Sequence, residues 1–296
     1  MHFPCLSTTT ASRVARIIGL LALTAVLAAC NAIKLGYNNL DEVAYWWLDG
    51  YVDFTDEQAT LVRQDIARIH LWHRTHELPR VGALLRELEE LAPNDISTPR
   101  ACAFVPALRE RLQAVADQAE PAVVTLAMGL GPQLQHLERK YEKNNADYRK
   151  EWVKLSPAEQ ADKRVRKFLE RGEMIYGALD EPQRIALRRQ VEQSVFDPRR
   201  ILAERQRRQQ DALQTLRKLT GQPVPFSEAR RLLRDYLARA QESPDAAYRG
   251  YQEKLVEESC RSFAALHNST TASQRAAAVR QLRAYQRDFA ELAARR

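Results

Sequence analysis

The sequence predicts an all-α protein, a single multi-helix, bundle-like domain of about nine or ten helices. Apolar residues recur at spacings of three and four, and no stretch after the first 30 residues shows sustained alternation of apolar and polar residues. Only 10 of the 296 residues are glycine, which argues against a turn-dense β-sandwich or a glycine-looped nucleotide fold. Hydrophobic residues make up 45% and charged residues 28%, so the composition excludes wholesale disorder.

The apolar spacing also places the helices along the chain. We expect them near residues 32–51, 55–92, 98–118, 120–154, 156–178, 180–195, 197–219, 226–241, 244–267 and 271–294. Proline and glycine mark the breaks at Ala92-Pro93-Asn94, Gly221-Gln222-Pro223 and Ser243-Pro244. The stretch Gly129-Leu130-Gly131-Pro132 is expected to kink or split the fourth helix.

Four helix starts carry the spacing of a capping box, in which a capping residue precedes Glu or Gln by three positions. The four strings are Thr55-Asp56-Glu57-Gln58, Ser156-Pro157-Ala158-Glu159, Asp180-Glu181-Pro182-Gln183 and Thr271-Ala272-Ser273-Gln274. Pro157 takes the first helical position, where its missing N–H costs nothing.

The first 29 residues have the pattern of a secretory signal. Arg13 and Arg16 precede the apolar stretch 17–27, which is too short to cross a hydrocarbon core of about 30 Å as a permanent helix. The following Leu27-Ala28-Ala29-Cys30 resembles the lipobox of bacterial lipoproteins, which implies cleavage before Cys30 and acylation of its sulfur and new amino group. An ordinary signal peptide with an incidental cysteine, or a signal anchor, is the alternative. We therefore divide the chain into a signal peptide (1–29) and an all-α lipoprotein domain (30–296).

Lipidation would place the protein in the cell envelope. Three acyl chains exceed the two signals that stable membrane anchoring needs. Asn31 follows Cys30 where enteric lipoproteins retained in the inner membrane have Asp, so by analogy we expect a periplasm-facing outer-membrane lipoprotein. The net charge of +7 is mild. We expect the membrane, an envelope protein, peptidoglycan or lipopolysaccharide as partners, and no nucleic acid.

Two cysteines, Cys102 and Cys260, remain after Cys5 leaves with the signal and Cys30 takes the lipid. In an oxidising compartment such a pair predicts a disulfide. It would close a loop of about 158 residues, for which chain entropy gives nominally about 5 kcal/mol of stability. Two buried free thiols are the alternative, and a metal site is weaker because neither cysteine has a second one at short spacing.

Aromatic residues are densest in the segment from Tyr45 to Phe54, which contains Trp46, Trp47 and Tyr51. One interpretation is an interfacial helix with its aromatic rings at the level of lipid headgroups. The other is a core helix that buries both tryptophans. We favour the core, because Asp41, Glu42, Asp49 and Asp53 oppose binding to an anionic surface.

Three of the six histidines lie close together at His70, His73 and His76. His70, His73 and Glu77 are weak candidates for a metal site. The string His76-Glu77-Leu78-Pro79-Arg80 departs from the His-Glu-x-x-His of zinc proteases, and Pro79 disrupts such a helix. We expect no metal here and favour a partly exposed polar face with His73–Glu77 and Arg74–Glu77 contacts.

Arginine is abundant, at Arg188-Arg189, Arg199-Arg200, Arg205, Arg207-Arg208 and Arg230-Arg231. An anion-binding strip is one interpretation. Solvated helix faces with ion pairs four residues apart are the one we favour, because acidic residues are interleaved. The sequence after the signal has no G-x-S-x-G, P-loop or paired metal motif, so we expect neither an enzyme nor a cofactor.

Residues 30–80 resemble a Gram-negative lipoprotein family of unknown function. The resemblance rests on the lipobox, Tyr37-Asn38-Asn39, the run Trp46-Trp47-Leu48-Asp49-Gly50-Tyr51-Val52-Asp53, and the run Trp72-His73-Arg74 through Glu77-Leu78-Pro79-Arg80. It implies no catalytic residues. We consider Trp46, Trp47, Tyr51, Trp72, His73 and Arg74 possible binding residues.

Two capping strings are similar to a second family. Thr55 to Gln58 and Asp180 to Gln183 resemble the Leu-Thr-x-x-Gln motif of small α-helical periplasmic stress chaperones. Our leading hypothesis is a non-enzymatic, lipid-anchored lipoprotein that binds an envelope component through helical surfaces. The alternatives are a chaperone-like holdase and, third, an envelope hydrolase that uses the His/Glu cluster.

Overall fold

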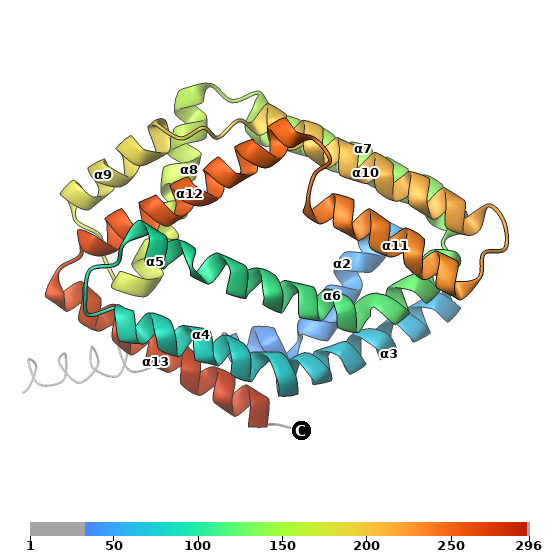
Figure 1. Ribbon diagram of the computed structural model, residues 1–296, viewed down its shortest axis with the longest axis horizontal. Helices are drawn as coiled ribbons and strands as arrows, with labels where there is room; N and C mark the ends of the chain where they lie inside the picture. The colour runs from blue at the N-terminus through green and yellow to red at the C-terminus, as the bar shows by residue number, and fades with distance from the viewer. Residues whose placement is uncertain (1–32, 295–296) are drawn as a thin grey trace, which may run out of the picture.

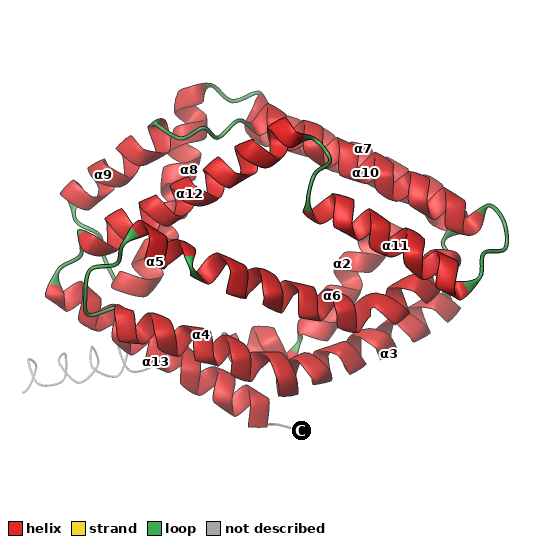
Figure 2. Cartoon of the chain, viewed as in Figure 1, coloured by secondary structure: helices red, strands yellow, loops and turns green. Residues whose placement is uncertain are grey.

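The computed structural model describes residues 33–294, and its regular structure there is helical throughout, without a strand (Figures 1 and 2). Residues 33–38 are helical and lead into α2. The helices are α2 (Leu40–Val52), α3 (Asp56–Trp72), α4 (Leu78–Leu91), α5 (Thr98–Cys102), α6 (Phe104–Met128), α7 (Leu134–Tyr148), α8 (Pro157–Tyr176), α9 (Glu181–Glu192), α10 (Pro198–Thr220), α11 (Phe226–Gln241), α12 (Ala246–Asn268) and α13 (Ala272–Ala294). The predicted all-α class is confirmed.

The helices form a closed circuit (Figure 1). From α4 the contacts run to α13, α8, α9, α12, α5, α6, α11, α10, α7, α2 and α3, and α3 leads back into α4. α4 and α13 lie side by side along one long edge, and α7 and α10 lie along the opposite one. The first and last described helices therefore meet neighbours that are distant in sequence.

Buried apolar residues form several small clusters along this circuit. One joins α6, α10 and α11 around Val124, Leu219 and Ala229. Another joins α5 and α12 around Ile96 and Cys260, and a third packs α8 against α13. Polar and covalent links between helices add to the stability of these contacts. Among residues 33–294, no helix combines the length and apolarity needed to cross a bilayer.

All four predicted capping boxes are confirmed. Thr55, Ser156 and Asp180 each accept a bond from the amide three residues later, and the side chain there bonds back. Thr271 and Gln274 exchange the same two bonds. The side chains of Gln183 and Gln274 also bond to each other at 2.9 Å, which ties the start of α9 to the start of α13.

Two predicted boundaries are wrong. α6 continues past residue 119 through Pro121 to Met128, because Val124 and Ala127 pack in the cluster with α11 and hold the chain helical. The expected helix 98–118 is instead divided at Ala103, which ends α5. The split at Gly129–Pro132 is confirmed, since α6 ends there and the short turn η2 (Gly131–Gln133) leads into α7.

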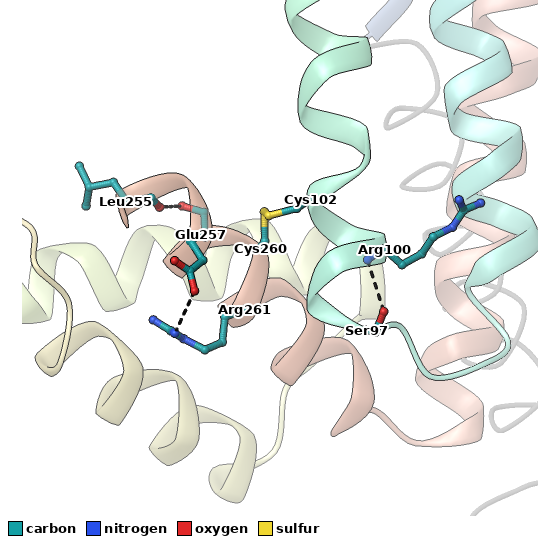
Figure 3. Close-up of a disulfide and its surroundings, with 8 residues drawn as sticks. Ser97, Arg100, Cys102, Leu255, Glu257, Cys260 and Arg261 are labelled. Carbon is teal, nitrogen blue, oxygen red and sulfur yellow. Dashed lines mark hydrogen bonds and ion pairs between the residues drawn. A yellow bond between two sulfur atoms is a disulfide. The ribbon is translucent and has the colours of Figure 1, made fainter. Parts of the chain in front are cut away.

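Cys102 and Cys260 form a disulfide that joins α5 to α12 (Figure 3). Their Cα atoms lie 5.3 Å apart, and the two residues are 158 positions apart in sequence. Cys260 is buried in the cluster that also contains Ala101 and Ala264. The bond therefore closes the circuit between early and late helices at a packed contact.

The arginine pairs bind carboxylates within and between helices. Arg231 bonds to Glu228 within α11, as expected for a solvated face. Arg230 and Arg234, however, both donate to the buried Glu120 of α6, at 2.9 and 2.5 Å. Hydrogen bonds from these two arginines lower the pKa of Glu120 to about 2. One buried carboxylate thus fastens α11 to α6.

We expect Glu120→Gln to lower the free energy of unfolding by about 2 kcal/mol near pH 7, because two charge-assisted bonds are lost. The folded pKa of Glu120 lies below its ordinary 4.5, so this contribution is present above pH 4.5 and disappears as the pH falls towards about 2. Urea unfolding across this pH range checks both points. Glu228→Gln, which breaks an exposed pair within α11, is the matched control and should change stability far less, because solvent screens an exposed ion pair. Equal effects of the two variants at pH 7 would contradict the assignment.

Candidate functional site

The long helix from Asp56 to Leu91 widens in its middle. The π-helical turn η1 (His73–Glu77) separates α3 from α4, and the amide of Leu78 bonds to the carbonyl of His73. Pro79 explains the wider turn, because its ring collides with the carbonyl four residues earlier in a regular α-helix and it has no amide hydrogen. Pro79 therefore reshapes the helix without ending it. Such turns are frequent at functional sites.

The first described residues fold against this turn. We call the contact the N-terminal junction, and it consists of Lys34, Tyr37, Asn38, His70, His73, Arg74, Asp288 and Leu292. It brings together the Tyr-Asn-Asn and Trp-His-Arg motifs with the end of α13. The junction begins four residues after Cys30, which itself lies outside the described residues.

Tyr37 packs between two histidines. A hydrogen bond of 2.8 Å joins its hydroxyl to Nδ1 of His73, and its ring meets that of His70 edge-on at 4.8 Å. Burial raises the pKa of Tyr37 to about 12, although the nearby Arg74 charge acts in the opposite direction. Burial also lowers the pKa of both His70 and His73. At neutral pH the three rings therefore form an uncharged, hydrogen-bonded stack.

Arg74 links the two ends of the described chain. Its guanidinium donates to the side-chain oxygen of Asn38 at 3.0 Å and to the main-chain carbonyl of Leu292 at 3.3 Å. It also lies 5.1 Å from the centre of the Tyr37 ring. Leu292 is in the last turn of α13, where carbonyls lack partners within the helix and a cation is favourable. Lys34 adds an ion pair of 3.1 Å to the buried Asp288 of the same helix.

Glu77 faces a different neighbour. Its side chain is fully buried and accepts bonds from Arg80 at 2.8 Å and from Arg111 of α6 at 3.3 Å. His73 and Arg74 are partly exposed as expected, but their hydrogen bonds go to Tyr37, Asn38 and Leu292 and not to Glu77. Glu77 acts on His73 only through its charge, which raises the pKa of His73 against the effect of burial. The widened turn shifts the helical register, so residues on either side of it face different elements.

The described residues contain no cluster of three or more histidine, cysteine or acidic side chains arranged to hold a metal ion. The carboxylate of Glu77 is occupied by two arginines, and His73 is bonded to Tyr37. Nε2 of His70 is buried without a hydrogen-bond partner. This arrangement suits the fastening of one segment to another, since its donors and acceptors mostly bind each other.

The two tryptophans of α2 are on the surface. Trp46 is 70% exposed and Trp47 is 61% exposed, so the favoured interpretation of a core helix that buries them is wrong. The side of α2 that faces the body is occupied by smaller residues and by Tyr45 and Val52, which are buried. Sequence spacing alone could not tell which side would meet α3.

The other aromatic candidates are half-buried. Tyr51 packs against Tyr141 of α7 at 6.3 Å between ring centres, and its hydroxyl accepts a bond from Asn144 at 2.8 Å. Trp72 stacks on His76 at 5.8 Å. The structure thus brings His73 and Arg74 together in the junction, and leaves Trp46, Trp47, Tyr51 and Trp72 outside it.

Sequence reasoning missed the partners of the junction in α13 and the partner of Glu77 in α6. Arg111, Asp288 and the carbonyl of Leu292 lie far from the motif in sequence and have no distinctive pattern around them. The Tyr37-Asn38-Asn39 motif was the one pattern in the sequence that pointed to the junction, because its aromatic and amide side chains can bind a neighbouring helix.

We expect the Tyr37–His73 bond to be worth about 1 kcal/mol of stability. A double-mutant cycle with Tyr37→Phe and His73→Ala, measured by urea unfolding, isolates this coupling. Each single variant should destabilise the protein, and the double variant should destabilise it by less than the sum. Strict additivity of the two effects would contradict a direct bond.

Comparison with known proteins identifies one family. No curated protein and no solved structure matches the chain. A family model described as a family of unknown function, DUF6279, matches residues 50–249, about two thirds of the chain. The match includes η1 and the helices from α3 to α11, and it begins after the lipobox-like stretch and Tyr37. The chain belongs to the DUF6279 family.

Proposed function

We propose that this protein is a lipid-anchored lipoprotein of the cell envelope, non-enzymatic, that binds another envelope component through its helical surfaces. The observation that carries the proposal is the N-terminal junction. A chain tethered through Cys30 is held against its own body by Lys34, Tyr37 and Asn38, within eight residues of the lipid. A pull on the tether therefore acts directly on the folded domain.

Three further features support this proposal. The signal-like start and the lipobox-like Leu27–Cys30 precede the junction directly. The Cys102–Cys260 disulfide suits an oxidising compartment outside the cytoplasm. Asn31 suits the outer membrane, with the domain on the periplasmic side.

A binding role also fits the state of the polar residues that the sequence singles out. The junction and the Glu77 cluster use their charges in internal bonds, which favours a structural task over turnover of a substrate. The partner we propose is an envelope protein, peptidoglycan or lipopolysaccharide, and not nucleic acid.

The chaperone alternative has no separate observation in its favour. The strings that resemble the chaperone motif serve as capping boxes at the starts of α3 and α9. Gln58 and Gln183 also bond to neighbouring segments, at Gly129 and Ser269. These bonds account for both glutamines without a client. The hydrolase alternative would need the carboxylate of Glu77, which two arginines occupy.

We expect the protein expressed in a Gram-negative host to fractionate with the outer membrane. Its intact mass should correspond to cleavage before Cys30 and three acyl chains, and reduction should add the mass of two hydrogens for one disulfide. Cys30→Ala should remove the mass of the acyl chains, and the protein should no longer fractionate with the membrane. Residues 33–294 lack a helix that could span the bilayer, so no described segment replaces the lipid.

The same material tests the binding role. Crosslinking of the lipidated protein in cells should give a specific envelope partner that is lost when the protein is released by Cys30→Ala. An unlipidated, soluble and fully reduced wild-type protein would overturn the proposed location. If the purified protein turns over an envelope substrate and crosslinking finds no specific partner, the proposed non-enzymatic binding role is overturned.

A further inference from the structure

The α2 helix carries an exposed apolar face. Leu40, Val43, Trp46 and Trp47 are 43%, 58%, 70% and 61% exposed, and Leu35 just before the helix is 67% exposed. Their spacing of three and four places them on one side of the helix. Asn39 and Gly50 fall on the same side, and Glu42, four residues before Trp46, lies at its edge. Large apolar surfaces that remain uncovered mark interaction sites.

The acidic residues of α2 are directed elsewhere. Asp41 lies 4.0 Å from Nδ1 of His70, and Glu42 forms an ion pair of 2.6 Å with Arg63, both on α3. Asp49 accepts a bond from the amide of Phe54 at the end of the helix. Asp53, just after the helix, lies 3.7 Å from Nδ1 of His136. The carboxylates of Asp41 and Asp49 are thus turned towards the body or the helix end, and Glu42 at the edge of the face is paired with the cation of Arg63. The acidic content of α2 therefore does not oppose contact between that face and a lipid surface.

We propose that this face of α2 lies in the headgroup layer of the same membrane that holds the lipid on Cys30. The inference rests on the proposed lipidation. Leu35 is five residues and Trp47 seventeen residues after Cys30, and even a fully extended chain spans only about 3.5 Å per residue. The junction prevents the helix from turning freely on this short tether, because Tyr37 and Asn38 fix its start to η1.

The chemistry of the face favours a bilayer over a protein partner. Tryptophan is enriched at the membrane–water interface, where its ring meets acyl chains and its N–H meets water or headgroups. Lys140 of α7 lies beside the end of the face, with Nζ 5.5 Å from the centre of the Tyr51 ring. The ammonium group of Lys140, which also lies beside Gly50, is a cation at that edge that can reach lipid phosphates.

Lipid bromination tests the location. The full, lipidated protein is reconstituted into vesicles of phosphatidylethanolamine and phosphatidylglycerol, with or without bromine on the acyl chains near the headgroups. Bromine quenches tryptophan at contact distance. We expect the wild type to lose roughly half of its tryptophan emission in brominated vesicles, since Trp46 and Trp47 are two of its four tryptophans. The variant Trp46→Phe/Trp47→Phe should lose almost none.

A matched control places a tryptophan on another exposed apolar site. Ile185 is 44% exposed and belongs to α9, which lies at the left edge of the molecule in Figure 1, apart from α2. Ile185→Trp in the background of the two phenylalanine substitutions should fluoresce without quenching. Leu40→Ser/Val43→Ser keeps both native tryptophans and should reduce their quenching at least twofold, which covers the case in which the tryptophan variant folds poorly.

The outcomes separate the inference from the proposed function. Intact mass and flotation with the vesicles report lipidation independently of fluorescence. A lipidated protein that floats but shows the same quenching with and without Trp46 and Trp47 overturns the inference and leaves the lipoprotein role in place. A protein without acyl chains that does not float overturns both. If a crosslinker placed at position 47 captures a protein, and brominated lipid does not quench the tryptophan emission, the face binds a protein partner and the inference is overturned.

Discussion

The guanidinium of Arg74 links the beginning of the described chain to its end, beside the ion pair between Lys34 and Asp288. Arg74 donates to Asn38 near the start and to the carbonyl of Leu292 in the last turn of α13. The carbonyl has no partner within its own helix, and the positive charge meets the negative end of the helix dipole. Arginine suits this task because its planar fork offers several donors in fixed directions. This contact adds to the packing of α4 against α13, where the circuit of helices closes.

The circuit also explains why specific links are distributed around it. Among the described residues, buried apolar clusters lie at separate contacts, of α6 with α10 and α11, of α5 with α12, and of α8 with α13. The disulfide between Cys102 and Cys260 fixes α5 to α12, and Glu120 fixes α6 to α11. Arg74 completes the set on the side of α13. Each of these links joins segments more than 100 residues apart, and each lies where two helices already pack.

The helical class and most helix starts could be predicted because they depend on local chemistry. A capping box such as Thr55 to Gln58 is complete within four residues, and apolar spacing shows one amphipathic face. The predicted burial of Trp46 and Trp47 was wrong, because apolar spacing shows which residues share a helix face but not whether another helix covers that face. The Glu77 contacts were wrong because Pro79 widens the helix, and that change of register has no separate signal. The contact between the two ends of the described chain could not be predicted, because Arg74 and Leu292 are 218 positions apart in sequence and no local pattern links them.

Hydrogen exchange with mass spectrometry on the wild type and Arg74→Lys tests the central role of Arg74 most directly. Lysine keeps the charge but loses the fork that binds Asn38 and Leu292 together. The account predicts faster exchange in two segments that are remote in sequence, residues 33–39 and 286–294, with little change in α10 and α11. Faster exchange confined to η1 and its neighbours in the same helix, or no change at either end, would contradict it.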